Sequence, residues 1–166
     1  MKNKKRSAIK KIELSKFWLM VFLVGFALMI FYFYKQKTEF ASVRLSTEIK
    51  SVSLQETFPL MLTIDSSYEI EKVDLLITYD PKLVDLEEVS DFSPTRKKPN
   101  LQKKRGSFRL QAQNLGKKTA LTMLFITKKI AGKTDIIIDK EKSSLIANSR
   151  NITPKNLPTV SMIIEK

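Results

Sequence analysis

The residue types that carry most enzymatic chemistry are scarce in this chain. It has no histidine and no cysteine, which removes the commonest general base, the commonest metal ligand and every thiolate site. Carboxylates cluster at 85–88 and 139–141, in both cases within polar stretches that also carry lysines. A glycosidase pair needs a cleft and one carboxyl of raised pKa, and a calcium loop needs oxygen ligands at alternate positions around a central Gly. No segment supplies either pattern, so the sequence predicts a protein that is not an enzyme, with no catalytic residue, cofactor or metal ligand.

The motif Tyr79-Asp80-Pro81 has a functional and a structural interpretation. In the first, Asp80 is a ligand or an acid. In the second, Pro81 sets φ at the second position of a turn while the Asp80 side chain accepts hydrogen bonds from backbone N–H groups. Asp-Pro turns commonly end strands, so the structural interpretation is favoured.

Positive charge is concentrated in the stretch 91–105, which contains two prolines and few apolar residues. This composition predicts a long exposed loop. No tract interleaves Arg and Lys with aromatic residues, so the net charge of +13 does not predict nucleic-acid binding. We expect the loop either to speed association with an acidic partner or to bind an anionic wall polymer. Its basic residues are Arg96, Lys97, Lys98, Lys103, Lys104 and Arg105.

Strands with a two-residue period must position these side chains. Residues 58, 60, 62 and 64 fall on one face of a strand, and Val73, Leu75, Ile77 and Tyr79 share an inward face in the next. Further runs lie at 41–45, 84–89, 108–112, 121–127, 134–138 and 160–164, with Pro, Gly, Asn and Asp between them. Seven to nine short strands without crossover helices predict an all-β antiparallel sandwich.

An apolar segment precedes the strands. Residues 17–34 contain no charged side chain and would form a helix of about 27 Å, close to the thickness of bilayer hydrocarbon. Aromatic residues lie at both ends, and residues 1–16 carry seven Lys or Arg against one Glu. By the positive-inside bias, these features predict a transmembrane helix that spans the lipid bilayer once, with the N-terminus cytoplasmic and the C-terminal domain extracytoplasmic.

The predicted organisation is therefore a basic cytoplasmic tail (1–16), a transmembrane helix or signal anchor (17–34), a stalk (35–41) and a β-sandwich (42–166). Two alternatives stay open for the apolar segment. A cleaved signal peptide would have a shorter apolar region and a small-x-small exit, and a buried helix would carry polar residues on one face.

Several runs of the sandwich resemble cohesin domains. Residues 52–64 are similar to the turn and strand that open those domains. The stretch from Val73 to Leu86 resembles their strand that ends in Tyr-Asp-Pro and leads into a Leu-rich strand. The segments 106–112 and 121–134 are similar to later cohesin stretches, and 143–147 is similar to the region before their last strand, all in the same order.

The resemblance implies a jelly-roll sandwich of about nine strands, related to cellulose-binding modules. It also implies a binding module that recruits a dockerin-bearing protein at the cell surface. The sequence departs from the pattern at Gln55, where cohesins usually have Gly, and it contains no dockerin-like calcium-loop repeat. On this fold, we expect outward-facing strand residues to contact the partner directionally: Thr78, Arg109, Gln111 and Gln113.

Two other functions remain open. One is a structural or adhesive ectodomain of a surface assembly, and the other is binding of a polysaccharide or an anionic polymer. A sugar-binding platform usually needs a row of exposed Trp or Tyr. The single tryptophan, Trp18, lies in the predicted membrane segment, and Phe58, Phe108 and Phe125 have inward parity. The sequence therefore does not predict a cellulose-type platform.

Overall fold

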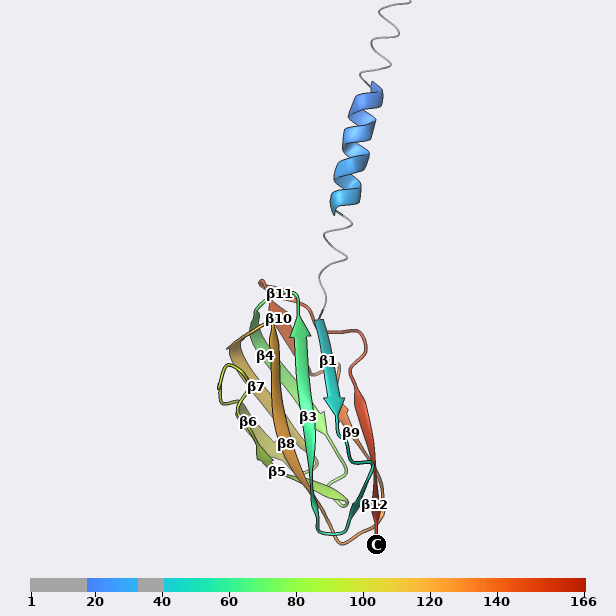
Figure 1. The fold of residues 1–166 in the computed structure, drawn as a ribbon, viewed down its shortest axis with the longest axis vertical. Coiled ribbons are helices and arrows are strands. Elements are labelled where there is room, and N and C mark those ends of the chain that lie inside the picture. The colour runs from blue at the N-terminus through green and yellow to red at the C-terminus, as the bar shows by residue number, and fades with distance from the viewer. Residues whose placement is uncertain (1–17, 33–40) are drawn as a thin grey trace, which may run out of the picture. The chain divides into compact units, whose positions relative to one another are not determined.

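A computed structural model describes residues 18–32 and 41–166 of the chain (Figure 1). The chain divides into two compact units, Met1–Glu39 and Phe40–Lys166. In the first unit the described residues form one helix, 18–32. The predicted tail 1–16 and the predicted stalk residues 35–40 lie outside the described residues, as do residues 17, 33 and 34 of the predicted span.

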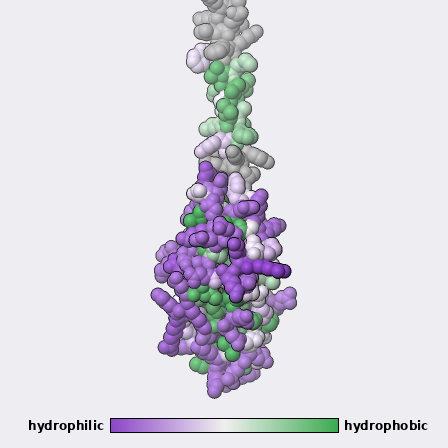
Figure 2. All heavy atoms as spheres, turned by 90° about the vertical axis from the view of Figure 1, so that its left-hand side faces the viewer, coloured by the Kyte–Doolittle hydropathy of each residue, from purple (hydrophilic) through white to green (hydrophobic). Residues whose placement is uncertain are grey.

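The helix does not support the predicted membrane anchor. Its side chains are mostly apolar and exposed, as Figure 2 shows. Crossing the hydrocarbon of a bilayer takes about 20 residues of apolar helix, and in the described part of the chain no helix combines the required length and apolar character. The prediction of a single-pass membrane protein, with a cytoplasmic N-terminus and an extracytoplasmic domain, is therefore wrong.

The second unit is built from antiparallel strands, with one parallel pair, β2 with β12. Side chains alternate along the longer strands, and every second one enters the core. The strands are β1 (Ala41–Ser46), β2 (Ser51–Ser53), β3 (Thr57–Ser66), β4 (Ile70–Thr78), β5 (Val84–Val89), β6 (Asn100–Lys104), β7 (Ser107–Leu115), β8 (Lys118–Thr127), β9 (Gly132–Ile138), β10 (Ser144–Ala147), β11 (Arg150–Asn151) and β12 (Thr159–Glu165).

These strands form two sheets packed face to face, and in Figure 1 β1, β3 and β8 lie in front of β4 and β7. The smaller sheet has the order β1-β3-β8-β5. In the larger sheet β4 is central. It pairs with β7 along its length, and β7 pairs with β6. On its other side β4 pairs first with β10 and then, at its last two residues, with β9.

The core lies between the sheets. Phe58, Phe108 and Phe125 are fully buried, and their rings pack against one another and against Tyr79. All the residues predicted to face inward on β3 and β4 are buried. The predicted all-β sandwich is confirmed. Four of its short strands, β2, β6, β10 and β11, have no counterpart among the predicted runs, and the described residues contain twelve strands rather than about nine.

Two local differences from the predictions have physical reasons. The stretch 91–105 is not one loop, because residues 100–104 form β6 at the edge of the larger sheet. All five side chains of β6 are exposed, so the strand shows no alternation in the sequence. At Gln55, where cohesins usually have Gly, φ is 63°, which is the left-handed conformation that Gly adopts most easily.

Candidate partner-binding face

The outer side of the larger sheet carries the strand residues predicted to contact a partner. Strand pairing places Thr78 opposite Ser107, and it sets Asp74 and Lys72 of β4 beside Gln111 and Gln113 of β7. Paired residues share a face, and the alternate residues of both strands are in the core. We call this surface the outer β4–β7 face. It consists of Lys72, Asp74, Leu76, Thr78, Asn100, Gln102, Arg109, Gln111, Gln113 and Ile137.

A hydrogen-bond network lies at the centre of this face. Arg109 donates from Nε to Asp74 Oδ1 at 2.6 Å, and Gln111 donates from Nε2 to Asp74 Oδ2 at 2.8 Å. Arg109 also donates to the backbone carbonyl of Lys142 at 3.3 Å. Both oxygens of one carboxylate are thus occupied by side chains of the neighbouring strand. The network holds Arg109 and Gln111 in place before any partner arrives.

The environment of Asp74 keeps it ionised. Burial of the carboxyl would raise its pKa, but this is outweighed by the hydrogen bonds from Arg109 and Gln111 and by the nearby charges of Arg109 and Lys72, so the pKa is lowered. Only 12% of the Asp74 side chain is exposed, against 41% of Arg109. The buried charge is therefore paired, while its partner still presents part of the guanidinium to solvent.

Beside the network lies a small apolar area. Ile137 of β9 is 41% exposed and pairs with Thr78 at the end of β4. The hydroxyl of Thr78 donates to the Ile137 carbonyl at 3.4 Å, and half-buried Leu76 follows on the same face of β4. Polar groups that fix orientation thus adjoin apolar side chains that a partner could cover, which is the usual composition of a binding patch.

A shallow hollow lies at the other end of the same face. Its volume is about 340 Å³, and Gln111 and Gln113 of β7 line it together with Lys72, Lys98 and Asn100. The hollow connects the predicted contact residues on β7 with the first half of the basic stretch. The four strand residues named from the sequence are therefore brought to one surface.

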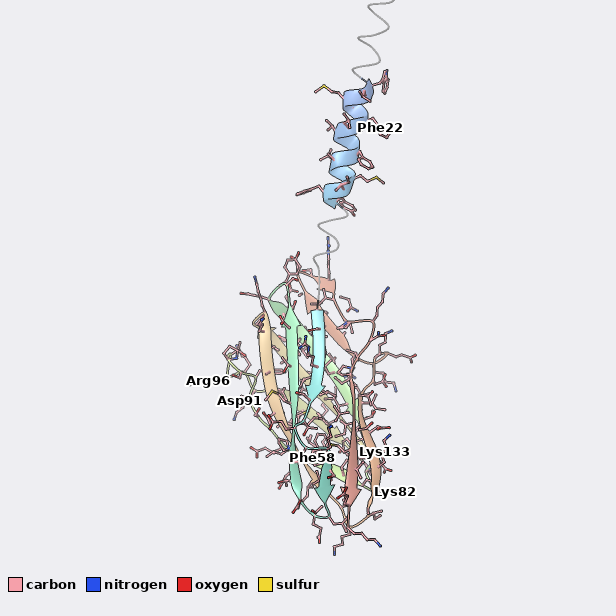
Figure 3. The ribbon with its side chains drawn as sticks, turned by 45° about the vertical axis from the view of Figure 1, so that its right-hand side comes forward. Phe22, Phe58, Lys82, Asp91, Arg96 and Lys133 are labelled. Atoms are coloured by element: carbon pink, nitrogen blue, oxygen red, sulfur yellow. The ribbon has the colours of Figure 1, made fainter. Side chains whose placement is uncertain are left out.

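The six basic residues of 91–105 are not brought together. Arg96, Lys97 and Lys98 belong to the turn and loop before β6, whereas Lys103, Lys104 and Arg105 belong to its end and to the following turn. A strand of this length separates the two groups by roughly 17 Å. In Figure 3, Arg96 and Asp91 lie together on the loop, far from Lys82 at the lower end of the sandwich. The prediction of a single basic loop is wrong for this reason.

Lys103 takes part in a second polar cluster, between the two sheets at their edge. Its ammonium lies 3.3 Å from Asp85 Oδ1 and donates to the carbonyl of Leu86. The hydroxyl of Tyr79 donates to the same carboxylate oxygen at 2.9 Å. Burial, followed by the hydrogen bond to Asp85 and its charge, raises the pKa of Tyr79 to about 12. For Asp85, burial is outweighed by the hydrogen bond from Tyr79 and by Lys103, and its pKa is lowered.

Two further acidic residues, Asp80 and Asp139, stabilise local turns. Asp80 accepts a hydrogen bond from the backbone of Lys82 at 2.8 Å, as the structural interpretation of the Asp-Pro turn requires. Asp139 accepts from the backbones of Glu141 and Lys142. In the described part of the chain, no three acidic, His or Cys side chains are grouped as a metal site would need.

The aromatic side chains of the described strands and loops do not form a sugar-binding row. The four described phenylalanines of the sandwich are fully buried, and Tyr79 is 6% exposed. Tyr68 is half-buried at the turn between β3 and β4. Stacking on a sugar ring needs flat, accessible rings, and the outer β4–β7 face presents none.

Comparison with known proteins identifies the fold. No protein-family profile matches the chain, and no curated protein is similar to it in sequence. Solved structures are similar. They include a cohesin module from a Clostridium perfringens family 33 glycoside hydrolase (TM-score 0.58, 13% identity, 76% of this chain and 96% of that chain). Another is a type I cohesin from Clostridium thermocellum in a dockerin complex (TM-score 0.61, 13% identity, 76% of this chain and 99% of that chain). A third is a type II cohesin domain from the Acetivibrio cellulolyticus cellulosome (TM-score 0.60, 10% identity, 74% of this chain and 95% of that chain). The β-sandwich of this chain has a cohesin-like fold.

Proposed function

We propose that this chain is a cohesin-type binding module that holds a dockerin-like protein partner on the outer β4–β7 face. The observation that carries the proposal is the Asp74–Arg109–Gln111 network, which lies next to the exposed Ile137 on a sandwich of cohesin-like fold. In this proposal the sandwich is a jelly roll, as in the domains it resembles, and the protein binds without turnover.

The similar structures support the class of partner. The Clostridium thermocellum structure is a type I cohesin–dockerin complex, and an Acetivibrio cellulolyticus structure holds a cohesin with a dockerin. Their sequences are only 13% identical to this chain. Such distant chains share a backbone but few contact residues, so the residues that select a partner are to be read from this face itself.

The face suits a partner that binds a surface already formed. Ile137 and Leu76 offer apolar area beside the network, and a few buried side chains of this kind supply much of the free energy of an interface. Arg109 and Gln111 are held by Asp74, so little side-chain entropy remains to be lost when they contact a partner. Thr78 and Gln113 complete the polar rim. A standard interface buries about 800 Å² on each side, which a sheet face of several strands can supply.

The test is a pull-down with the full-length chain as bait, followed by calorimetry of the captured protein with variants of two faces. Ile137→Asp places a charge in the proposed contact and is expected to weaken binding at least about a hundredfold. Met61→Asp is the matched control, because Met61 is an exposed apolar strand residue (48%) on the outer side of the smaller sheet.

Binding that survives Ile137→Asp but is lost with Met61→Asp would move the interface to the other sheet. Capture of a partner without a dockerin-like calcium-loop repeat, on the same face, would retain the binding face and reject the dockerin class. Unfolding curves of both variants check that neither effect comes from loss of the fold.

A further inference from the structure

A basic pocket lies at the end of the sandwich where three turns meet. It has a volume of about 530 Å³ and is lined by Lys103 and Lys104 from the end of β6 and by Arg105 and Gly106 from the β6–β7 turn. The turn between β4 and β5 contributes Pro81, the loop after β8 contributes Lys128, and Asp85 of β5 is the one carboxylate among the lining residues. These segments are far apart in the sequence, so no local pattern indicates the pocket.

The walls of this pocket are joined by short-range contacts. The backbone N–H of Tyr79 donates to the Gly106 carbonyl at 3.0 Å. Lys128 donates from its backbone to Leu83 at 2.8 Å and from Nζ to the Pro81 carbonyl at 2.6 Å. The three turns are therefore held together before any ligand binds, and the lining cations need little reorganisation to receive one.

The pocket carries more positive charge than the protein neutralises. Lys103 is paired with Asp85 at 3.3 Å. Lys104 and Arg105 form no ion pair with any described carboxylate. The ammonium of Lys128 is held by a carbonyl, which orients it but leaves its full charge. A neighbouring hollow shares Lys128 and adds Lys82 and Lys129 beside Ile126 and Ile130, so the positive charge continues along the end of the sandwich next to apolar side chains.

We propose that this end binds a linear anion that carries phosphate groups. The guanidinium of Arg105 can form paired hydrogen bonds with a phosphate, and the lysines act as point charges beside it. The lining contains no aromatic ring on which a sugar or base could stack. Two hollows that share Lys128 match a chain of successive charges better than a single small ion. This site lies at the end of the sandwich and does not depend on the proposed protein partner.

The test measures binding of inorganic tripolyphosphate to the full-length chain by calorimetry at low salt. The double variant Lys104→Ala with Arg105→Ala is expected to weaken binding about tenfold or more. The matched control, Lys97→Ala with Arg96→Ala, removes the same charges and the same residue types from the other end of β6, and it is expected to change binding less than about twofold.

Orthophosphate and long-chain polyphosphate serve as further probes. The affinities of tripolyphosphate and of long-chain polyphosphate are compared per binding site. A higher affinity for the long chain indicates a polymeric ligand, and equal affinities indicate a small soluble one. Either result supports recognition of phosphate groups at this end. Equal losses in the two double variants would show attraction by overall charge and overturn the site, as would absence of tripolyphosphate binding.

Discussion

Gly106 joins two of the turns at the end of the sandwich, and its replacement by alanine tests how closely they are packed. Its φ is +78°, a left-handed conformation that costs a residue with a Cβ about 1–2 kcal/mol. An added Cβ would lie 3.0 Å from Pro81 Cδ and 3.2 Å from the Tyr79 carbonyl oxygen. Overpacking of this kind adds about 1–3 kcal/mol. We therefore expect Gly106→Ala to lower the free energy of unfolding by about 2–5 kcal/mol.

Urea unfolding followed by circular dichroism measures this change, and Gly116→Ala is the control. Gly116 has no left-handed φ, and a Cβ there would meet nothing closer than 3.8 Å. We expect its replacement to change stability by less than about 1 kcal/mol, because an unstrained Gly→Ala substitution mainly restricts the unfolded chain. Similar losses in the two variants, or a loss below about 0.5 kcal/mol for Gly106→Ala, would refute the argument from close packing.

Three further predictions concern β4 and its neighbours. Leu75→Asp should cost several kcal/mol by placing an unpaired carboxylate in the core, whereas Thr78→Asp on the outer side should cost clearly less in the same urea titration. The lowered pKa of Asp74 means that its ionised form adds stability above pH about 3.8, which is lost as pH falls through the folded-state pKa. Asp74→Asn should therefore lower the free energy of unfolding at neutral pH and make it depend less on pH in the acid range. If the variant loses stability on acidification as much as the unmodified protein does, the network does not hold Asp74 in its ionised form. In an absorbance titration of the folded protein, one phenolate should form near pH 12 and disappear in Tyr79→Phe; its persistence would assign it to another tyrosine.

Alternation in the sequence predicted the strands that have one face in the core. On β3 and β4 every residue predicted to point inward is buried, because apolar side chains repeat there with a period of two. Strand β6 was missed for the opposite reason. It lies at the edge, all its side chains are exposed, and Asn-Leu-Gln-Lys-Lys carries no alternation.

The polar contacts of the candidate face could be predicted only in part. Thr78, Arg109 and Gln111 were placed on the outer face by parity alone. The role of Asp74 was not foreseen, since an outward carboxylate looks solvent-exposed until the register of β4 with β7 is known. That register places Gln111 directly opposite Asp74 and Arg109 within 2.6 Å of its carboxylate. No local pattern encodes a pairing between residues so far apart in the chain.

The membrane prediction rested on composition and on the apolar run at 17–34, and it was contradicted by the extent of the described helix.

The basic stretch was misjudged because the number of charged residues says nothing about where a strand interrupts a loop. Pairing of residues 100–104 with β7 sends half of the basic side chains to each end of β6.

The position of β6 also affects how the protein behaves when it is concentrated. In the described part of the chain, β6 has β7 on one side and no strand on the other. Its free backbone groups could pair with the edge of a second molecule and start ordered aggregation. Lys103 and Lys104 stand on this short strand, and lysines on an edge strand oppose pairing because a second copy would bring further positive charge to the same edge. The edge is thereby protected from self-association, and the same lysines that line the basic pocket help to keep copies of the sandwich apart.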